Sequence, residues 1–139
     1  MAGNVHQLRE RVGESEKITI NLGYVDLGRV DLLVQEGFYS TRTDFIRTAI
    51  RNQLTAQADA VANSVDRQTL EIGLRDYRRA DLEAVRATGE RLHIKVLGLV
   101  RIASDVTPKL ALATIESITV LGALQASPEV KSALARRIR

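Results

Sequence analysis

The residues best suited to specific recognition stand in the short stretch KITINL, at residues 17–22. Lys17, Thr19 and Asn21 alternate there with aliphatic residues, so an extended chain carries all three on one face. Lys offers only hydrogen-bond donors, whereas Thr and Asn offer both donors and acceptors. The pattern predicts a β-strand with one hydrogen-bonding face. The polar face of any half-exposed sheet can show the same alternation.

A second polar group, residues 40–43, marks the start of a predicted helix. Thr41 and Asp44 have the spacing of a capping box, in which the two side chains accept from N–H groups that no helical carbonyl reaches. The helix therefore begins after Thr41, and its first turn retains free backbone N–H groups. This group comprises Ser40, Thr41, Arg42 and Thr43.

A shorter helix is predicted before this turn. Asp26 can act as its N-cap, and the helix ends near Glu36, because Gly37 can take the left-handed conformation that closes a helix. The second helix then carries apolar residues at helical spacing, and its pattern can continue through LTAQADAVAN. The aliphatic face of the strand and this helix supply the predicted core, which comprises Ile18, Ile20, Leu22, Phe45, Ile46 and Ile50.

One strand and two short helices cannot form a stable fold alone. The backbone groups of a lone strand have no partner, and a unit of residues 16–62 buries too little surface. Antiparallel pairing of the strand with that of a second copy corrects both faults. We therefore predict an obligate, intertwined homodimer.

The rest of the chain, residues 66–139, contains an internal repeat. HIKVLGLVRIAS and SITVLGALQAS share the letters VLG, and each follows a Leu- and Ala-rich stretch. LEIGLRDYR can begin the series, and SPEVKSALARRI ends it. Such repeats predict a small α/β or solenoid-like domain, with two similar strands of an ordinary α+β domain as the alternative. The expected self-association residues are Val96, Leu97, Val120 and Leu121.

Composition restricts the possible functions. The 139 residues are 45% hydrophobic and 27% charged, as in globular proteins. The absence of Cys excludes disulfides and thiolate metal sites, and His6 and His93 lack metal-ligand spacing. No catalytic triad, phosphate loop or metal motif occurs. We expect no enzymatic activity, no cofactor and no metal. No apolar stretch has the length of a signal peptide or membrane span, which predicts a cytoplasmic protein.

Charge is distributed unevenly along the chain. The net charge is +3, yet residues 16–54 hold five basic and five acidic residues. The excess lies downstream, in YRRAD and in the terminal ARRIR. A basic tail is either a solvated end or a sequence-independent contact to phosphates. Residues 1–15 are polar, and we interpret them as a flexible arm.

Residues 15–55 resemble the ribbon-helix-helix family of transcriptional regulators, of the CopG, Arc and MetJ type. The stretches that carry the resemblance are KITINL, VQEGFYS and TRTDFIRTAIRNQL. It implies that two strands, one from each chain, form an antiparallel ribbon in the major groove of DNA. It also implies that the second helix points its N-terminus at a phosphate.

The resemblance assigns roles to the two polar groups. Lys can reach guanine, Asn can pair with adenine, and Thr can contact thymine, so Lys17, Thr19 and Asn21 become the expected base contacts. Free N–H groups and the helix dipole favour an anion at the second helix. The expected phosphate contacts are Ser40, Thr41, Arg42 and Thr43.

These inferences predict an α+β protein that binds double-stranded DNA as a homodimer and assembles further through its C-terminal domain. The leading function is a sequence-specific transcriptional repressor, associated with the nucleoid and not with a membrane. One alternative is an antitoxin whose tail neutralises a toxin partner. Antitoxin tails are usually disordered until bound, whereas this tail has the pattern of a preformed structure. The other alternative is an architectural protein that coats DNA.

Overall fold

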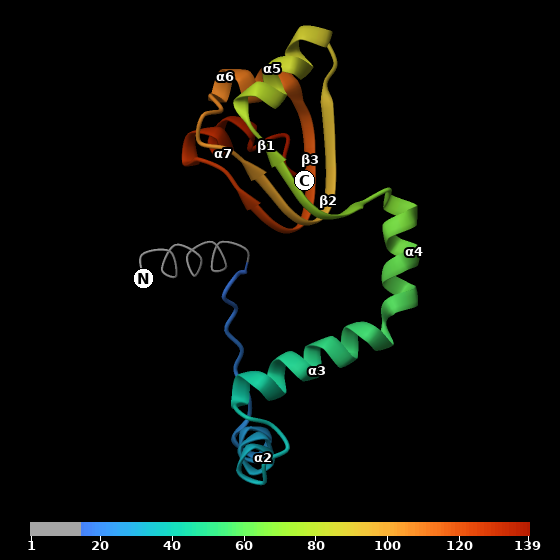
Figure 1. The fold of residues 1–139 in the computed structure, drawn as a ribbon, viewed down its shortest axis with the longest axis vertical. Coiled ribbons are helices and arrows are strands. Elements are labelled where there is room, and N and C mark those ends of the chain that lie inside the picture. The colour runs from blue at the N-terminus through green and yellow to red at the C-terminus, as the bar shows by residue number, and fades with distance from the viewer. Residues whose placement is uncertain (1–14) are drawn as a thin grey trace. The chain divides into compact units, whose positions relative to one another are not determined.

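The computed structural model describes residues 15–139, which fold as two compact units, residues 15–64 and residues 65–139 (Figure 1). Helices occur in both units and a three-stranded sheet occurs in the second, so the fold is α+β, as predicted. The arm predicted at residues 1–15 lies, except for its last residue, outside the described residues.

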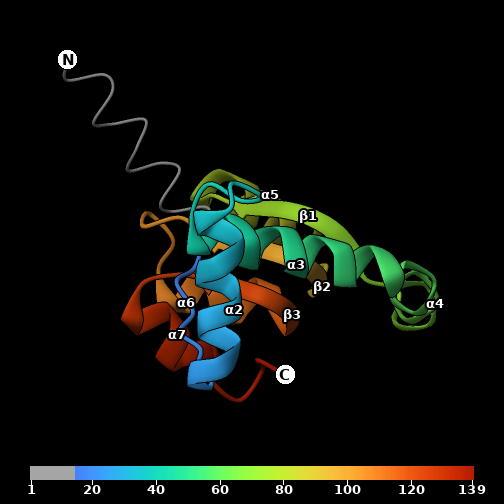
Figure 2. The same cartoon turned by 90° about the horizontal axis from the view of Figure 1, so that it is seen from below.

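The first unit contains the two expected helices, α2 (Tyr24–Gln35) and α3 (Arg42–Ala56). Figure 2 shows α2 lying across the beginning of α3. The prediction for Gly37 is confirmed, because its φ is 84°. The N–H of Gly37 donates to the carbonyl of Val34 at 3.1 Å, and that of Phe38 donates to Leu33 at 3.0 Å. These paired bonds form a Schellman motif, which closes α2.

Two predicted helix boundaries are wrong. Gly23, not Asp26, is the N-cap of α2, so the Asp26 carboxylate lies in the first turn and faces the positive end of the helix dipole. The second helix does not run unbroken through LTAQADAVAN. It ends at Ala56, and α4 (Ala58–Gln68) begins after a turn at Gln57.

The first unit has almost no core of its own. Among residues 15–64, only Val30 is buried. Residues 15–23 form neither helix nor strand in the single chain. Large hydrophobic side chains stand exposed throughout the unit, among them Ile18, Ile20, Leu22, Val25, Leu32, Ile50 and Leu54.

The second unit consists of three consecutive strand-helix pairs. They are β1 (Glu71–Tyr77) with α5 (Arg79–Thr88), β2 (Leu92–Ile102) with α6 (Pro108–Thr114), and β3 (Ile115–Gln125) with α7 (Pro128–Leu134). The strands are parallel, in the order β1-β2-β3. The register pairs Val96 with Val120 and Leu97 with Leu121, so the two VLG segments lie side by side. Figure 1 shows the three helices together on one side of the curved sheet.

The core of this unit lies between the sheet and its helices. Val96 is buried and Val120 packs against the same core, so both valine side chains already pack within their own chain. The prediction that Val96 and Val120 contact a partner is therefore wrong, and only Leu97 and Leu121 remain as expected self-association residues. The main buried residues of the core are Leu82, Ile94, Val100, Ile102, Leu110, Ile115, Ile118, Val130 and Leu134.

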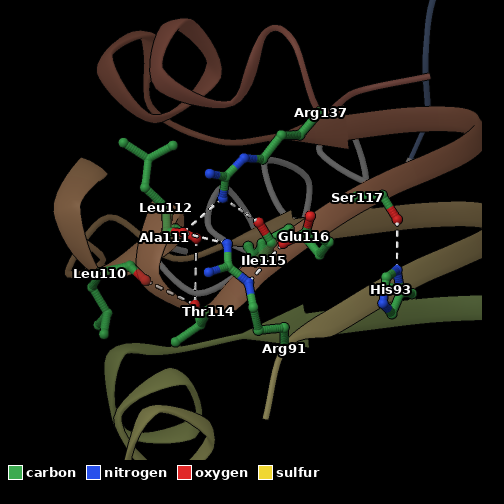
Figure 3. A network of polar contacts seen from close by, with 10 residues as sticks. All are labelled: Arg91, His93, Leu110, Ala111, Leu112, Thr114, Ile115, Glu116, Ser117 and Arg137. Carbon is green, nitrogen blue, oxygen red and sulfur yellow. Dashed lines mark hydrogen bonds and ion pairs between the residues drawn. The ribbon is translucent and has the colours of Figure 1, made fainter. Parts of the chain in front are cut away.

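Two arginines hold the C-terminal end of α6 (Figure 3). Arg137 donates through Nη1 to the carbonyls of Leu112 and Ile115, both at 2.7 Å. Arg91 donates to the Leu112 carbonyl at 3.1 Å and pairs with Glu116 at 2.7 Å. Cations at a helix C-terminus satisfy carbonyls that lack helical donors. Arg137 of the ARRIR tail therefore has an internal structural role, which neither interpretation of the tail anticipated.

A row of glycines crosses the sheet, with Gly73, Gly98 and Gly122 in register. The φ angle of Gly98 is 142° and that of Gly122 is 126°, a region that side chains rarely permit. A Cβ on Gly98 would overlap the carbonyl oxygen of Gly73, and one on Gly122 would overlap that of Gly98. Glycine is therefore required both by the backbone conformation and by the close approach of the neighbouring strand.

We predict that Gly98→Ala destabilises the second unit more than Gly73→Ala does. Both positions have positive φ, which costs about 1–3 kcal/mol for a non-glycine residue. Only Gly98 adds a clash with backbone, because a Cβ on Gly73 meets no atom within 4 Å. Chemical denaturation of the two variants measures the difference. Equal losses of unfolding free energy would contradict the close approach.

Candidate nucleic-acid interface

The predicted ribbon is displayed at the surface of the single chain. Lys17, Thr19 and Asn21 are all exposed, as expected of groups that recognise a ligand. The alternate residues Ile18 and Ile20 are also exposed, to 72% and 57%. Strict alternation puts these two sets on opposite faces of an extended strand. Whatever covers the aliphatic face will therefore direct the polar face outward.

The N-terminus of α3 has the geometry of an anion site. Thr41 is extended, with φ −150°, and its Oγ1 accepts from the N–H of Asp44 at 3.0 Å. The Asp44 carboxylate accepts from the N–H and the hydroxyl of Ser40, at 3.0 and 3.2 Å. Among residues 15–139, no group accepts from the N–H of Arg42 or Thr43. Two free donors at the positive end of a 15-residue helix suit a phosphate oxygen.

The four predicted phosphate contacts thus lie together, but two of their side chains are already engaged. The Ser40 hydroxyl donates to Asp44, and the Thr41 hydroxyl accepts from the Asp44 N–H. The free donors at this site belong to the backbone. The Asp44 carboxylate also places a negative charge in the first turn, where it repels a phosphate while it stabilises the helix.

The Arg42 side chain is turned toward α2 by an ion pair. Its Nε and Nη2 donate to the two carboxylate oxygens of Asp31, at 2.7 and 2.8 Å. This bidentate hydrogen bond lowers the pKa of Asp31 and raises that of Arg42. Because the folded pKa of Asp31 is depressed, the pair is intact at neutral pH and is lost only as the pH falls through that value. Contact between the guanidinium and a phosphate requires that Arg42 leave Asp31 or share itself between the two.

Asp31 is the residue of this site that the sequence did not reveal. It lies 11 positions before Arg42, on a different helix, so no periodic pattern joins them. The pair is exposed, with side chains 56% and 47% accessible, so it adds little stability. The main effect of Asp31 is on the local charge, because the carboxylates of Asp31 and Asp44 offset the positive charge of Arg42 at the α3 N-terminus.

Two other kinds of site are not found in the part of the chain that the structure describes. No group of three or more His, Cys, Asp and Glu side chains there is arranged to hold a metal ion. No helix between residues 15 and 139 combines the length and apolar character needed to cross a membrane.

Comparison with protein families gives a match to the ribbon-helix-helix transcriptional regulator family over residues 13–131. This match takes in most of the chain, including both structural units. The chain belongs to the ribbon-helix-helix family. Searches of curated proteins and of solved structures found no match.

Family membership identifies the chain as a DNA-binding transcriptional regulator. It confirms the resemblance carried by KITINL, VQEGFYS and TRTDFIRTAIRNQL. The match continues through most of the three strand-helix pairs, so the second unit is part of what the family model describes.

We predict that Arg42→Pro weakens binding to every DNA sequence more than Arg42→Ala does. Both variants lose the guanidinium and its pair with Asp31, but only proline removes the backbone N–H. Proline suits the first position of a helix, and Thr41 before it is already extended. A hydrogen bond to a charged group contributes about 1.5–3 kcal/mol, so the further loss should be at least about tenfold.

Fluorescence anisotropy with specific and unrelated duplexes measures this loss, and circular dichroism verifies that the two variants keep equal helix content. Phosphate contacts carry no base information, so the loss should be uniform across sequences. Equal affinities for the two variants would show that the α3 N-terminus does not hold a phosphate.

Proposed function

We propose that the protein is a dimeric, sequence-specific transcriptional repressor. In this proposal residues 17–22 of two copies pair as an antiparallel ribbon that enters the major groove, and the α3 N-termini anchor the ribbon to the flanking phosphates. The observation that carries the proposal is the aliphatic face of KITINL, which the single chain leaves exposed in a unit with one buried residue.

The dimer follows from the missing core. Ile18, Ile20 and Leu22 are 72%, 57% and 42% exposed. Burial of an aliphatic side chain stabilises a fold by about 1.5–3 kcal/mol, so leaving all three in water sacrifices much of the stability of a small domain. A second copy supplies both the pairing strand and a surface on which these residues pack. Phe45 and Ile46, half-buried on α3, are the natural partners for that face.

Dimer formation in turn orients the reading surface. Once the aliphatic face packs inward, Lys17, Thr19 and Asn21 point outward from both strands. The two symmetry-related strands of the ribbon then present the same donors and acceptors twice, which favours an inverted-repeat site. A dimer held on such a site blocks access of other proteins to the same DNA, which is the simplest route to repression.

The neutral charge of the DNA-binding unit supports self-association as part of the function. A neutral unit releases few counterions when it binds DNA, so a single dimer should bind DNA with modest affinity. Linked dimers on neighbouring sites gain effective concentration, and avidity can rise roughly 100-fold or more without new contacts. Leu97 and Leu121 lie on the sheet face opposite the helices and remain in the proposed self-association surface.

The second unit also favours a regulator over an antitoxin. It has a buried core between sheet and helices, whereas a toxin-binding tail usually folds only on its partner. An architectural role makes a different demand, since DNA coating needs no base preference. Sequence preference therefore decides between repressor and architectural protein.

We predict that Asn21→Ala relaxes base preference at one or two positions of each half-site, while Asn52→Ala leaves it unchanged. Asn52 is an exposed asparagine on α3 of the same unit, so it controls for the loss of one amide. The lost contact should cost about 1–3 kcal/mol on the best site.

Selection of bound duplexes from a random DNA pool measures the preference of all three proteins. The wild-type protein should enrich an inverted repeat. An unchanged motif for Asn21→Ala would remove the ribbon as the reading surface, and no motif for the wild type would favour the architectural role.

A further inference from the structure

The two edges of the sheet in the second unit differ, because β3 is bridged at Ile118 by the C-terminal residues and β1 is open along its length among the described residues. At β3, the N–H of Ile118 donates to the carbonyl of Arg137 at 2.8 Å, and the N–H of Arg139 donates to Ile118 at 2.7 Å. No described segment pairs in this way with the outer side of β1. Its residues 71–76 are all exposed, with Ile72 at 71% and Leu74 at 51%. Such an edge is a template for another strand.

The backbone of β1 shows which groups this edge presents. The Tyr77 carbonyl accepts from the N–H of Ala103 at 2.9 Å, and the Gly73 carbonyl lies against Gly98. The carbonyls of these odd-numbered residues thus point toward β2. Since backbone groups alternate between the two sides of a strand, those of Ile72 and Leu74 point to the open side.

The side chains of β1 are self-complementary about Gly73. Reading outward from this glycine, Ile72 is matched by Leu74, and Glu71 is matched by Arg75. A strand with this arrangement can pair antiparallel with an identical strand. Within residues 71–75, each apolar residue then opposes an apolar residue, and each charge opposes its opposite.

We propose that β1 pairs antiparallel with β1 of a second copy, on a two-fold axis at Gly73, to form a continuous six-stranded sheet. Ile72 and Leu74 of the partner subunit exchange backbone hydrogen bonds with Leu74 and Ile72. Gly73 and Glu71 stand in the closer pairs without hydrogen bonds, whose Cα atoms are about 4.5 Å apart. Glycine on the axis suits such an approach, because it brings no side chain between the strands.

The two charges determine the direction of pairing. Within one chain, Arg75 Nε lies 2.6 Å from Glu71 Oε2, and both side chains are more than half exposed. In the antiparallel pair, Glu71 stands opposite the partner subunit's Arg75, so each ion pair can pass from within a chain to between chains. Charged residues usually protect an edge strand, but here their signs match those of a second copy. In-register parallel pairing would place like charges side by side.

The pairing is closed, because each chain uses its β1 edge once. A two-fold contact of this kind adds a second copy without generating a fibre. A hollow of about 240 Å³ beside β1 is lined by residues 71–75 and Val96. It leaves space for side chains of the partner subunit. The contact joins two second units, which belong either to one DNA-binding dimer or to two.

This inference rests on the self-association in the proposed function, and it is tested without DNA. The chain contains no Cys, so single cysteines can be introduced cleanly. Glu71→Cys and Arg75→Cys, co-expressed in the full-length protein with different affinity tags, should form a disulfide between chains under mild oxidation. The predicted Cα separation falls within the range that a disulfide spans.

Each variant alone should not cross-link, because its two cysteines would stand about four residues apart along the strands, roughly 13 Å, beyond disulfide reach. Glu71→Cys with Asp76→Cys is the matched control, since Asp76 is the exposed neighbour of Arg75 in the same strand. Cross-linking of Glu71→Cys with itself, or of the control pair, or of no pair, would overturn the proposal.

A charge exchange tests the same register without cysteines. Glu71→Arg and Arg75→Glu each make β1 self-repelling and remove its internal ion pair, yet the two variants are complementary to each other. Hydrogen exchange of the Ile72 and Leu74 amides should be slow in the wild type, fast in each variant and slow again in the co-expressed pair. Unchanged slow exchange in the core strand β2 verifies folding, and fast exchange at Ile72 and Leu74 in the wild type would contradict the pairing.

The outcome is separable from that for DNA recognition. A cross-link together with loss of DNA binding preference would reject the proposed repressor and retain the β1 pairing. A protein that selects an inverted repeat but does not cross-link would reject the pairing alone.

Discussion

The aliphatic face of residues 17–22 is the constraint on which the DNA-binding unit depends. Its side chains are exposed in the single chain, and the strand pattern has no pairing partner among the described residues. In the proposed dimer, a second copy of the segment supplies both hydrophobic burial and backbone hydrogen bonding. The direction of the polar face follows from this packing, because the two faces of a strand point in opposite directions. In the proposed function, DNA recognition is therefore conditional on dimer formation.

The second unit pairs its strands and buries its hydrophobic residues within one chain. Its strands find partners in their own neighbours, its helices cover one sheet face, and Arg91 and Arg137 close the end of α6. The glycine row is what allows the strands to approach at their bend. The β1 edge of this unit, with residues 71–76 all exposed, is available for contact with another chain. In the proposed function the two units have separate roles, because the first reads DNA and the second joins copies.

Local signals in the sequence were enough to locate the first unit. Thr41 and Gly37 act through neighbours a few residues away, so the α3 start and the α2 end were predictable from residue types alone. The ribbon-helix-helix family was predictable for the same reason. The N-cap at Gly23 was missed, because Asp26 is the better capping residue by type while the backbone begins its helix earlier.

The features that escaped prediction depend on residues far apart in the chain. The pair between Asp31 and Arg42 joins two helices, and Arg137 reaches carbonyls more than 20 positions earlier. The orientation of Val96 and Val120 toward the core required knowledge of which sheet face the helices cover. The repeat was visible in the letters VLG, but the reason for its glycine appears only when two strands lie side by side.

The most direct test of the account is the concentration dependence of unfolding of the DNA-binding unit by itself. A chain truncated after Gln68 lacks β1 and all later elements, so the measured unfolding is that of the first unit. Denaturation followed by circular dichroism over a wide range of protein concentration measures its midpoint. The account predicts one cooperative transition that moves to higher denaturant as concentration rises, because unfolding is coupled to dissociation. A folded monomer whose midpoint does not depend on concentration would contradict it.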